Sequence, residues 1–231
     1  QYDVKSAFLN GELVEEIYLK KPQGFDDGNG VLRLKKSLYG LKQAARVWNE
    51  TLHNTLVKYG CVQSETDKCL YSNTSGGEVC LVLVHVDDIL VSGENEKTVD
   101  RLMTSVQKDF EIKDLGPVKH YLGIDVLRDK SGNFSISQEK YIEKILQETG
   151  QINAKESKYP LDPGYQKLEG QFLNTNDEYR KIIGMLMYTA VNSRPDIAAS
   201  VSILSQKVSK PRDVDLSEAK RVCRYLKGTK D

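Results

Sequence analysis

Apolar residues recur at helical spacing in several stretches of the chain. Ala45, Trp48, Leu52, Leu56 and Tyr59 lie three or four positions apart, which predicts an amphipathic helix that ends at the glycine after Tyr59. The same spacing predicts further helices over residues 99–110, 141–146, 197–208 and 216–226.

Shorter apolar runs predict strands. Runs over residues 81–86 and 89–91 enclose Asp87 and Asp88, which is typical of a β-hairpin with two acids at its tip. Other strands are expected over residues 17–20, 31–34, 121–127 and 134–137, with a turn over residues 22–30. Helices and strands alternate irregularly. The pattern therefore favours an α+β fold, an antiparallel sheet with helices on one face, over a doubly wound parallel sheet.

The pattern changes after residue 149. Residues 150–176 lose their periodicity and contain Pro160, Pro163 and several glycines, which is typical of a linker. Thr175 and Glu178 resemble a capping box that opens a helical C-terminal third. The expected organisation is a first domain over residues 1–149, a linker-like segment over 150–176 and a helical region over 177–231.

Composition narrows the function classes. The 231 residues suffice for one large domain or two small ones. Thirty-three basic and 33 acidic residues cancel, so only local basic stretches, around residues 20–46 and 220–230, are candidates for phosphate contact; a solvated surface is the alternative. Four cysteines without paired spacing argue against a zinc site and a disulfide-rich secreted fold. No run reaches the roughly 18 apolar residues of a membrane span, so we expect an intracellular chain with no membrane partner.

Asp87 and Asp88 are the strongest chemical signal. Adjacent carboxylates repel each other unless one is protonated or a cation neutralises them. Oxygen ligands suit Mg²⁺, which keeps some of its waters and binds substrate phosphates. Asp3, far away in the sequence, is a third acid that would complete such a site. Asp is also a common turn residue, so a plain solvated turn is the alternative interpretation.

Four sequence strings occur in an order that is found in one protein family. They are DVKSAFLNG at residues 3–11, SLYGLKQ at 37–43, VDDIL at 86–90 and HYLGI at 120–124. Together they resemble the reverse transcriptases of copia-type retrotransposons, most firmly over residues 3–146. The resemblance implies a reverse-transcriptase palm with partial fingers and the start of the thumb in residues 1–149. It also implies a thumb or connection region of helices that leads toward an RNase H domain.

The resemblance gives each acid a role. Asp3 and Asp87 are expected to bind Mg²⁺ directly, with Asp88 in support and the Val4 carbonyl as a further ligand. Two Mg²⁺ ions, or Mn²⁺, would assist nucleotidyl transfer from a dNTP to a primer 3′-hydroxyl. Lys113 lies near the place of a lysine that could protonate the leaving pyrophosphate. An ordinary surface lysine is the alternative.

The resemblance also places nucleotide and primer contacts. Phe8 falls where an aromatic side chain lies under the deoxyribose and excludes a 2′-hydroxyl, and Gly40 would let the backbone approach the nucleotide and template. The alternative interpretation is that Phe8 is a core phenylalanine and Gly40 an ordinary loop glycine. The expected nucleotide-binding residues are Phe8, Tyr39 and Gly40. The expected primer grip is a hairpin over residues 120–125 that includes Tyr121, Leu122 and Gly123, and an ordinary sheet hairpin is the alternative.

The implied partners are an RNA or DNA template with its primer, dNTP, and the protease, integrase and RNase H domains of a Pol polyprotein, within a cytoplasmic virus-like particle. The chain begins at Gln1, directly on the strand of Asp3, so we expect a piece of a longer protein that lacks its upstream fingers segment and shows little activity alone. His85 and Ala45 stand where relatives have Tyr and Pro, and an imidazole is smaller than a phenol and can titrate. These departures keep open a degenerate or repurposed palm that at most binds nucleic acid.

Overall fold

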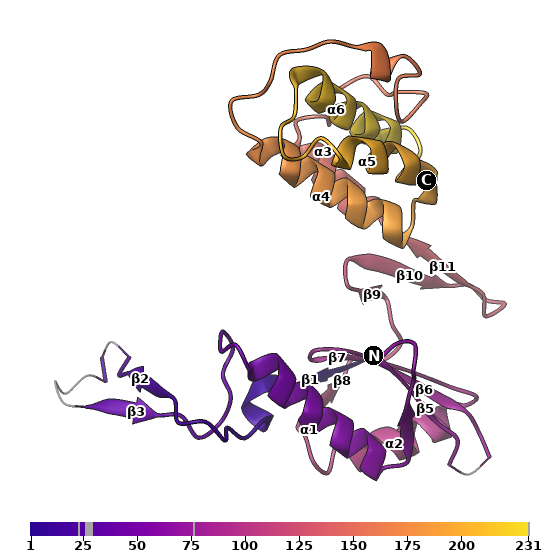
Figure 1. Cartoon of the computed structure of the whole chain (residues 1–231). Coiled ribbons are helices and arrows are strands. Elements are labelled where there is room, and N and C mark those ends of the chain that lie inside the picture. Colours follow the sequence, from indigo (N-terminus) through magenta and orange to yellow (C-terminus); the bar gives the residue numbers. More distant parts are fainter. Residues whose placement is uncertain (23, 26–29, 76, 231) are drawn as a thin grey trace. The chain divides into compact units, whose positions relative to one another are not determined.

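The computed structural model describes residues 1–22, 24–25, 30–75 and 77–230. The chain forms two compact units, residues 1–118 and residues 119–231, each made from one continuous stretch (Figure 1). The expected mixture of helices and antiparallel strands is confirmed. Within the described residues, none of the helices has the length and apolar content needed to cross a bilayer.

The first unit is built on a six-stranded antiparallel sheet with the strand order β4-β5-β6-β7-β1-β8. Its strands are β1 (Tyr2–Val4), β4 (Cys61–Gln63), β5 (Leu70–Asn73), β6 (Cys80–His85), β7 (Asp88–Gly93) and β8 (Ile112–Asp114). Strands β6 and β7 form the hairpin predicted from the apolar runs. Strand β1 lies between β7 and β8, so the start of the chain is placed at this hairpin.

One face of this sheet is buried by two helices. Side chains alternate between the two faces of a strand, and along β6 the residues Cys80, Val82 and Val84 are buried while His85 is exposed. Helices α1 (Ala44–Lys58) and α2 (Glu96–Val106) pack their apolar residues into the same core. Both helices match the predicted spacing. The opposite face of β6, β7 and β1 is not covered by these helices and carries His85, Asp88 and Asp3 at one end.

Strands β2 (Tyr18–Lys20) and β3 (Val31–Arg33) form a separate antiparallel hairpin, as predicted from their apolar runs. The turn expected over residues 22–30 lies in part outside the described residues, at residues 23 and 26–29. Between β1 and β2, a short 3-10 helix, η1 (Ala7–Asn10), follows the strand of Asp3 and carries Phe8.

The second unit combines a small sheet with helices. Strands β9 (His120–Tyr121), β10 (Ile124–Arg128) and β11 (Phe134–Ser137) form an antiparallel sheet. The single strand expected over residues 121–127 is wrong, because Leu122 and Gly123 have φ of 49° and 78° and reverse the chain there. Left-handed values at both central residues are typical of a tight hairpin turn.

The helices of the second unit share one core of buried apolar side chains. They are α3 (Glu139–Glu148), η2 (Tyr165–Lys167), α4 (Asp177–Asn192), η3 (Pro195–Ile197), α5 (Ala198–Ser205) and α6 (Asp213–Lys227). The C-terminal third is therefore helical, as predicted from its apolar spacing.

Residues 150–176 are mostly irregular, as expected, but they do not separate the two units. The division between units falls between Val118 and Lys119. Tyr165, within the segment, is 2% exposed, and its hydroxyl donates to Asp215 at 2.7 Å. The segment therefore packs on the helices of its own unit, because its buried tyrosine supplies an anchor that proline and glycine content does not reveal.

The capping box expected at Thr175 and Glu178 is wrong. Asn176 precedes α4, and its side chain makes no capping hydrogen bond. A capping bond occurs instead at the start of α6, where the Asp215 carboxylate accepts the backbone N–H of Arg212 at 2.7 Å.

Candidate functional site

Four side chains form a row across the uncovered face of the six-stranded sheet. His85 of β6 pairs with Asp88 of β7, Asp88 pairs with Asp3 of β1, and Asp3 pairs with Lys113 of β8. Directly opposite residues of an antiparallel pair share a face, with Cβ atoms about 5 Å apart. The register thus brings together residues that are far apart in the sequence, and it places two carboxylates side by side between two basic side chains.

The β6–β7 turn consists of Val86 and Asp87, because His85 and Asp88 on either side are already paired. Val86 has φ 57°, a left-handed conformation that costs a β-branched residue on the order of 1–3 kcal/mol. The Asp87 carbonyl accepts the backbone N–H of Val4 at 2.8 Å. The main chains of two residues expected at the metal site, Val4 and Asp87, are therefore in direct contact.

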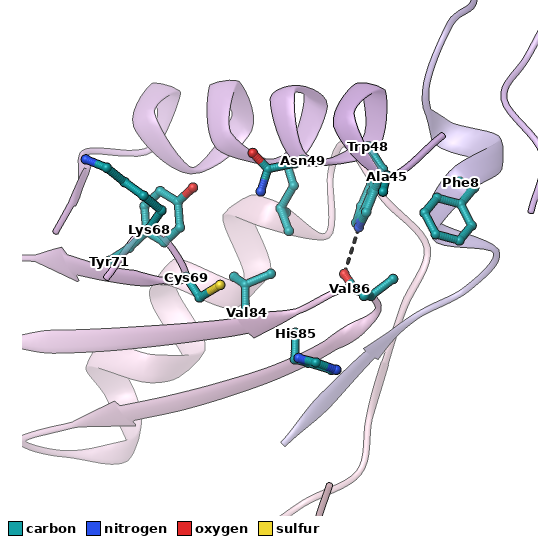
Figure 2. Close-up of a pocket in the computed structure, with 11 residues that line it drawn as sticks. Phe8, Ala45, Trp48, Asn49, Lys68, Cys69, Tyr71, Val84, His85 and Val86 are labelled. Carbon is teal, nitrogen blue, oxygen red and sulfur yellow. Dashed lines mark hydrogen bonds between the residues drawn. The ribbon is translucent and has the colours of Figure 1, made fainter. Parts of the chain in front are cut away.

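Trp48 of α1 reaches the same turn from the buried side of the sheet. Its indole N–H donates to the Val86 carbonyl at 2.7 Å, and Figure 2 shows this bond beside Val84, which points toward α1, and His85, which points away. Trp48 was expected only as an apolar helix residue. Its role at the turn depends on the packing of α1 against β6 and β7, which the spacing of apolar residues does not specify.

The donor set at the turn suits Mg²⁺, which prefers carboxylate and carbonyl oxygens. Asp3 and Asp88 face each other, and Asp87 lies in the turn just before Asp88. In the part of the chain that the structure describes, however, no group of three or more His, Cys, Asp or Glu residues is arranged to hold a metal ion. The site therefore offers a pair of facing carboxylates with a third acid in the adjoining turn, and water and phosphate oxygens are the ligands that Mg²⁺ takes in addition.

Phe8 and Tyr39 lie close together although 30 residues separate them. Their ring centroids are 5.8 Å apart, with the planes tilted by 46°. Phe8 is half-buried, whereas Tyr39 is exposed and Gly40 beside it has φ 96°, which favours glycine. Among the three residues expected to bind the nucleotide, Phe8 and Tyr39 are therefore in contact with each other. Gly40 has a backbone conformation that favours glycine.

A pocket of about 230 Å³ lies between α1 and strands β5 and β6. Its lining joins Phe8, Trp48 and Val86 at one end (Figure 2) with Cys69 and Tyr71 at the other. Burial raises the pKa of the Tyr71 phenol, so this group stays neutral at physiological pH. No sequence pattern predicts this pocket, because its walls come from segments that only the tertiary fold brings together.

Tyr121, Leu122 and Gly123 form the β9–β10 hairpin of the second unit. The hydroxyl of Tyr188, on α4, donates to the Leu122 carbonyl. A Cβ atom placed on Gly123 would lie 3.4 Å from the same hydroxyl oxygen. The hairpin expected as a primer grip is therefore seated on α4, and Tyr188, which sequence reasoning missed, supports its turn.

Comparison with known proteins identifies the family. A family model described as reverse transcriptase (RNA-dependent DNA polymerase) matches residues 1–163. The chain belongs to the reverse transcriptases of copia-type retrotransposons. The matched residues of this reverse transcriptase contain all four sequence strings and the row of Asp3, Asp88, His85 and Lys113.

Three relatives illustrate the match. Retrovirus-related Pol polyproteins from transposon TNT 1-94 of Nicotiana tabacum and transposon RE1 of Arabidopsis thaliana are 37% and 38% identical over 99% of this chain. A transposon Ty5-1 protein of Saccharomyces cerevisiae is 36% identical, and the match covers 99% of this chain and 76% of that protein. The chain spans only 18% of the tobacco polyprotein and 16% of the Arabidopsis polyprotein. No solved structure matches it.

Proposed function

We propose that this reverse transcriptase chain is the RNA-directed DNA polymerase part of a Pol polyprotein, and that it extends a primer 3′-hydroxyl by two-metal nucleotidyl transfer. The observation that carries the proposal is the register that sets Asp3 opposite Asp88, with Asp87 in the adjoining turn. A pair of facing carboxylates on an uncovered sheet face is an unfavourable arrangement unless cations neutralise it. Family membership supports the same reading.

Asp3 and Asp87 would hold the metal, with Asp88 next to Asp3 as the supporting carboxylate and the Val4 carbonyl as a further oxygen. Bound Mg²⁺ or Mn²⁺ supplies charge neutralisation for the triphosphate and lowers the pKa of the attacking hydroxyl. The protein's own contribution is to supply the three carboxylates from two neighbouring strands, β1 and β7, and from the turn that precedes β7. Lys113, directly across from Asp3, would donate a proton to the departing pyrophosphate.

Phe8 would form the floor under the deoxyribose, and Tyr39 and Gly40 would contact the nucleotide from the adjoining loop. The contact between the Phe8 and Tyr39 rings supports this grouping. The hairpin of Tyr121, Leu122 and Gly123 would hold the primer terminus. The partners of the whole chain would be a primed RNA or DNA template, dNTP and the remaining Pol domains, within a cytoplasmic virus-like particle.

Primer extension by the longer protein encoded in the same reading frame tests the proposal. Asp87→Asn is expected to lower the rate by about 10³-fold or more, the loss of several kcal/mol of transition-state stabilisation. Glu111→Gln is the matched control, because Glu111 is an exposed acid on the same part of the sheet that pairs with Lys5 at 2.7 Å. Equal activity of Asp87→Asn and the control would refute the proposed site.

A palm fold that binds nucleic acid without synthesis is the second candidate. His85 opposite Asp88 favours it, as does the finding that the described residues contain no group of three or more metal-ligating side chains. This candidate predicts that the longer protein binds a primed template and fails to extend it. His85→Tyr, which restores the residue of most relatives, would then be the variant that recovers extension.

A further inference from the structure

The turn that carries Asp87 is strained at the residue before it and is held by two hydrogen bonds. A β-branched residue such as Val86, with φ 57°, keeps such a conformation only where its surroundings impose it. The Trp48 indole donates to the Val86 carbonyl at 2.7 Å. On the other side, the backbone N–H of Val4 donates to the Asp87 carbonyl at 2.8 Å. The two carbonyls of the turn are thus fixed from α1 and from β1.

The donor on the α1 side is itself immobilised. Trp48 is 2% exposed, and its ring makes an edge-to-face contact with Phe110, with centroids 5.2 Å apart. An indole has one N–H donor and no acceptor, so its orientation decides where that bond is made. In Figure 2 the bond runs from α1 to the turn of the β6–β7 hairpin. A phenylalanine at this position would keep most of the packing and lose only the donor.

We propose that Trp48 is a positioning residue for the metal-binding turn, because its indole N–H fixes the peptide plane between Val86 and Asp87. This inference rests on the proposed function, in which Asp87 binds the metal. The same peptide plane carries the N–H of Asp87, so its rotation changes the direction of the Asp87 main chain and side chain together. Trp48 acts through the turn and touches neither the metal nor the nucleotide.

Binding of Mn²⁺ to this chain, measured by water-proton relaxation, tests the proposal. Trp48→Phe is expected to weaken Mn²⁺ binding about fivefold, the ratio that corresponds to one ordinary hydrogen bond. Tyr71→Phe is the matched control, because Tyr71 is equally buried and lines the same pocket. Its hydroxyl accepts from Gln63 at 3.0 Å, away from the turn, so its removal should leave Mn²⁺ binding unchanged.

A rescue variant separates positioning from general destabilisation. Asn tolerates the left-handed region better than Val. Val86→Asn should therefore let the turn form without the hydrogen bond from Trp48. The double variant Trp48→Phe/Val86→Asn should then regain most of the lost Mn²⁺ affinity. A defect caused by a loosened core would not be recovered by a change in the turn. Failure of the double variant to regain affinity would contradict positioning.

Hydrogen exchange gives a readout that needs no metal. The chain contains one Trp, so its indole proton gives a single resonance in a nitrogen-edited spectrum. In the wild-type chain this proton should exchange slowly, and in Trp48→Phe the amides of Val4 and Asp88 should exchange faster than in Tyr71→Phe. A rapidly exchanging indole proton, or equal amide exchange in both variants, would overturn the role of Trp48.

The two claims fail in distinguishable ways. Asp87→Asn in the otherwise wild-type chain should abolish Mn²⁺ binding; if binding is unchanged, the metal assignment of the proposed function is wrong. The exchange rates of the indole proton and of the Val4 and Asp88 amides still decide whether Trp48 holds the turn. If Asp87→Asn abolishes binding while Trp48→Phe binds Mn²⁺ as the wild type does, the metal assignment survives and the positioning role is refuted.

Discussion

Asp3 lies directly opposite Asp88 on neighbouring antiparallel strands, on the sheet face that the helices leave uncovered. Like charges directly opposite each other destabilise a sheet. The pairing is therefore expected to lower the stability of the metal-free protein, and under the proposed function a cation bound between or beside the carboxylates would offset this cost. The Asp3–Asp88 pairing therefore connects the strand register with the proposed metal binding, and its effect on the free energy of unfolding can be measured.

Asp88→Asn should stabilise the metal-free protein. Removing one of the two facing charges is expected to raise the free energy of unfolding by about 0.5–1 kcal/mol in EDTA. Excess Mg²⁺ should reduce or reverse the gain, because only the wild type then keeps both charges for the ion. Denaturant unfolding with and without Mg²⁺ measures both values. Equal stability of the two proteins in EDTA would show that the carboxylates do not repel each other in the folded state.

Phe8→Val should relax the choice of sugar. If the Phe8 ring fills the space under C2′, a smaller side chain admits the 2′-hydroxyl, and the preference for dNTP over rNTP should fall about tenfold or more. Incorporation by the longer protein on a primed RNA template measures the ratio. Leu9→Ala serves as the control, since Leu9 is the adjacent residue of η1 and is exposed. An unchanged ratio in Phe8→Val would identify Phe8 as a core residue only.

Lys113→Met should slow the chemical step. A positioned acid contributes about 10²–10⁴-fold, so kcat is expected to fall by about 100-fold while KM for dNTP changes little. Lys5→Met is the matched control, because Lys5 lies on the adjoining stretch and its ammonium pairs with Glu111 at 2.7 Å. If the two variants have the same kcat, Lys113 is an ordinary surface lysine.

Asp215→Asn should destabilise the second unit in a pH-dependent way. Burial opposes ionisation of this carboxyl, but hydrogen bonds from Arg212 and Tyr165 outweigh burial and hold its pKa below the usual 3.8. A lowered folded pKa means that the stabilisation is fully present above the unfolded pKa of about 3.9 and is lost as pH falls through the folded value.

At neutral pH the loss in Asp215→Asn is expected to be about 2 kcal/mol, the scale of hydrogen bonds to a buried charge. At an acid pH below the folded pKa, the variant and the wild type should converge. Glu178→Gln, which breaks an exposed pair with Lys220, should cost less than about 0.5 kcal/mol and show no such convergence. Denaturant unfolding at both pH values provides the comparison. A pH-independent difference for Asp215→Asn would show that the carboxylate charge is not the stabilising feature.

The sequence predicted the local elements because their signals are local. The spacing of Trp48, Leu52 and Leu56 specifies α1, and the apolar runs around Asp87 specify the β6–β7 hairpin. The placement of Asp3 beside this hairpin followed from the chemistry that the family resemblance implied, and the register of β1 with β7 has this arrangement. The functional roles of these residues stay predictions.

What the sequence did not reveal depends on contacts between distant segments. The bond from Trp48 to Val86 requires α1 to lie across the hairpin turn, and no periodicity encodes which carbonyl an indole will meet. The division of the chain at residues 118–119 was missed because the segment rich in proline and glycine lies later, where the buried Tyr165 ties it down. The apolar character of residues 121–127 predicted one strand, whereas the left-handed pair at Leu122 and Gly123 turns the chain into a hairpin, as the family resemblance implied.

The chain passes from one compact unit to the other only once, between Val118 and Lys119. Strands β1 to β8 all precede this junction, and strands β9 to β11 all follow it. A genetic crossover at this point between two related elements would leave both hydrophobic cores whole. A crossover inside the first unit, for example between β6 and β7, would join strands that were never selected to pack together. A gene that exchanged one half at this junction would therefore still encode two intact cores.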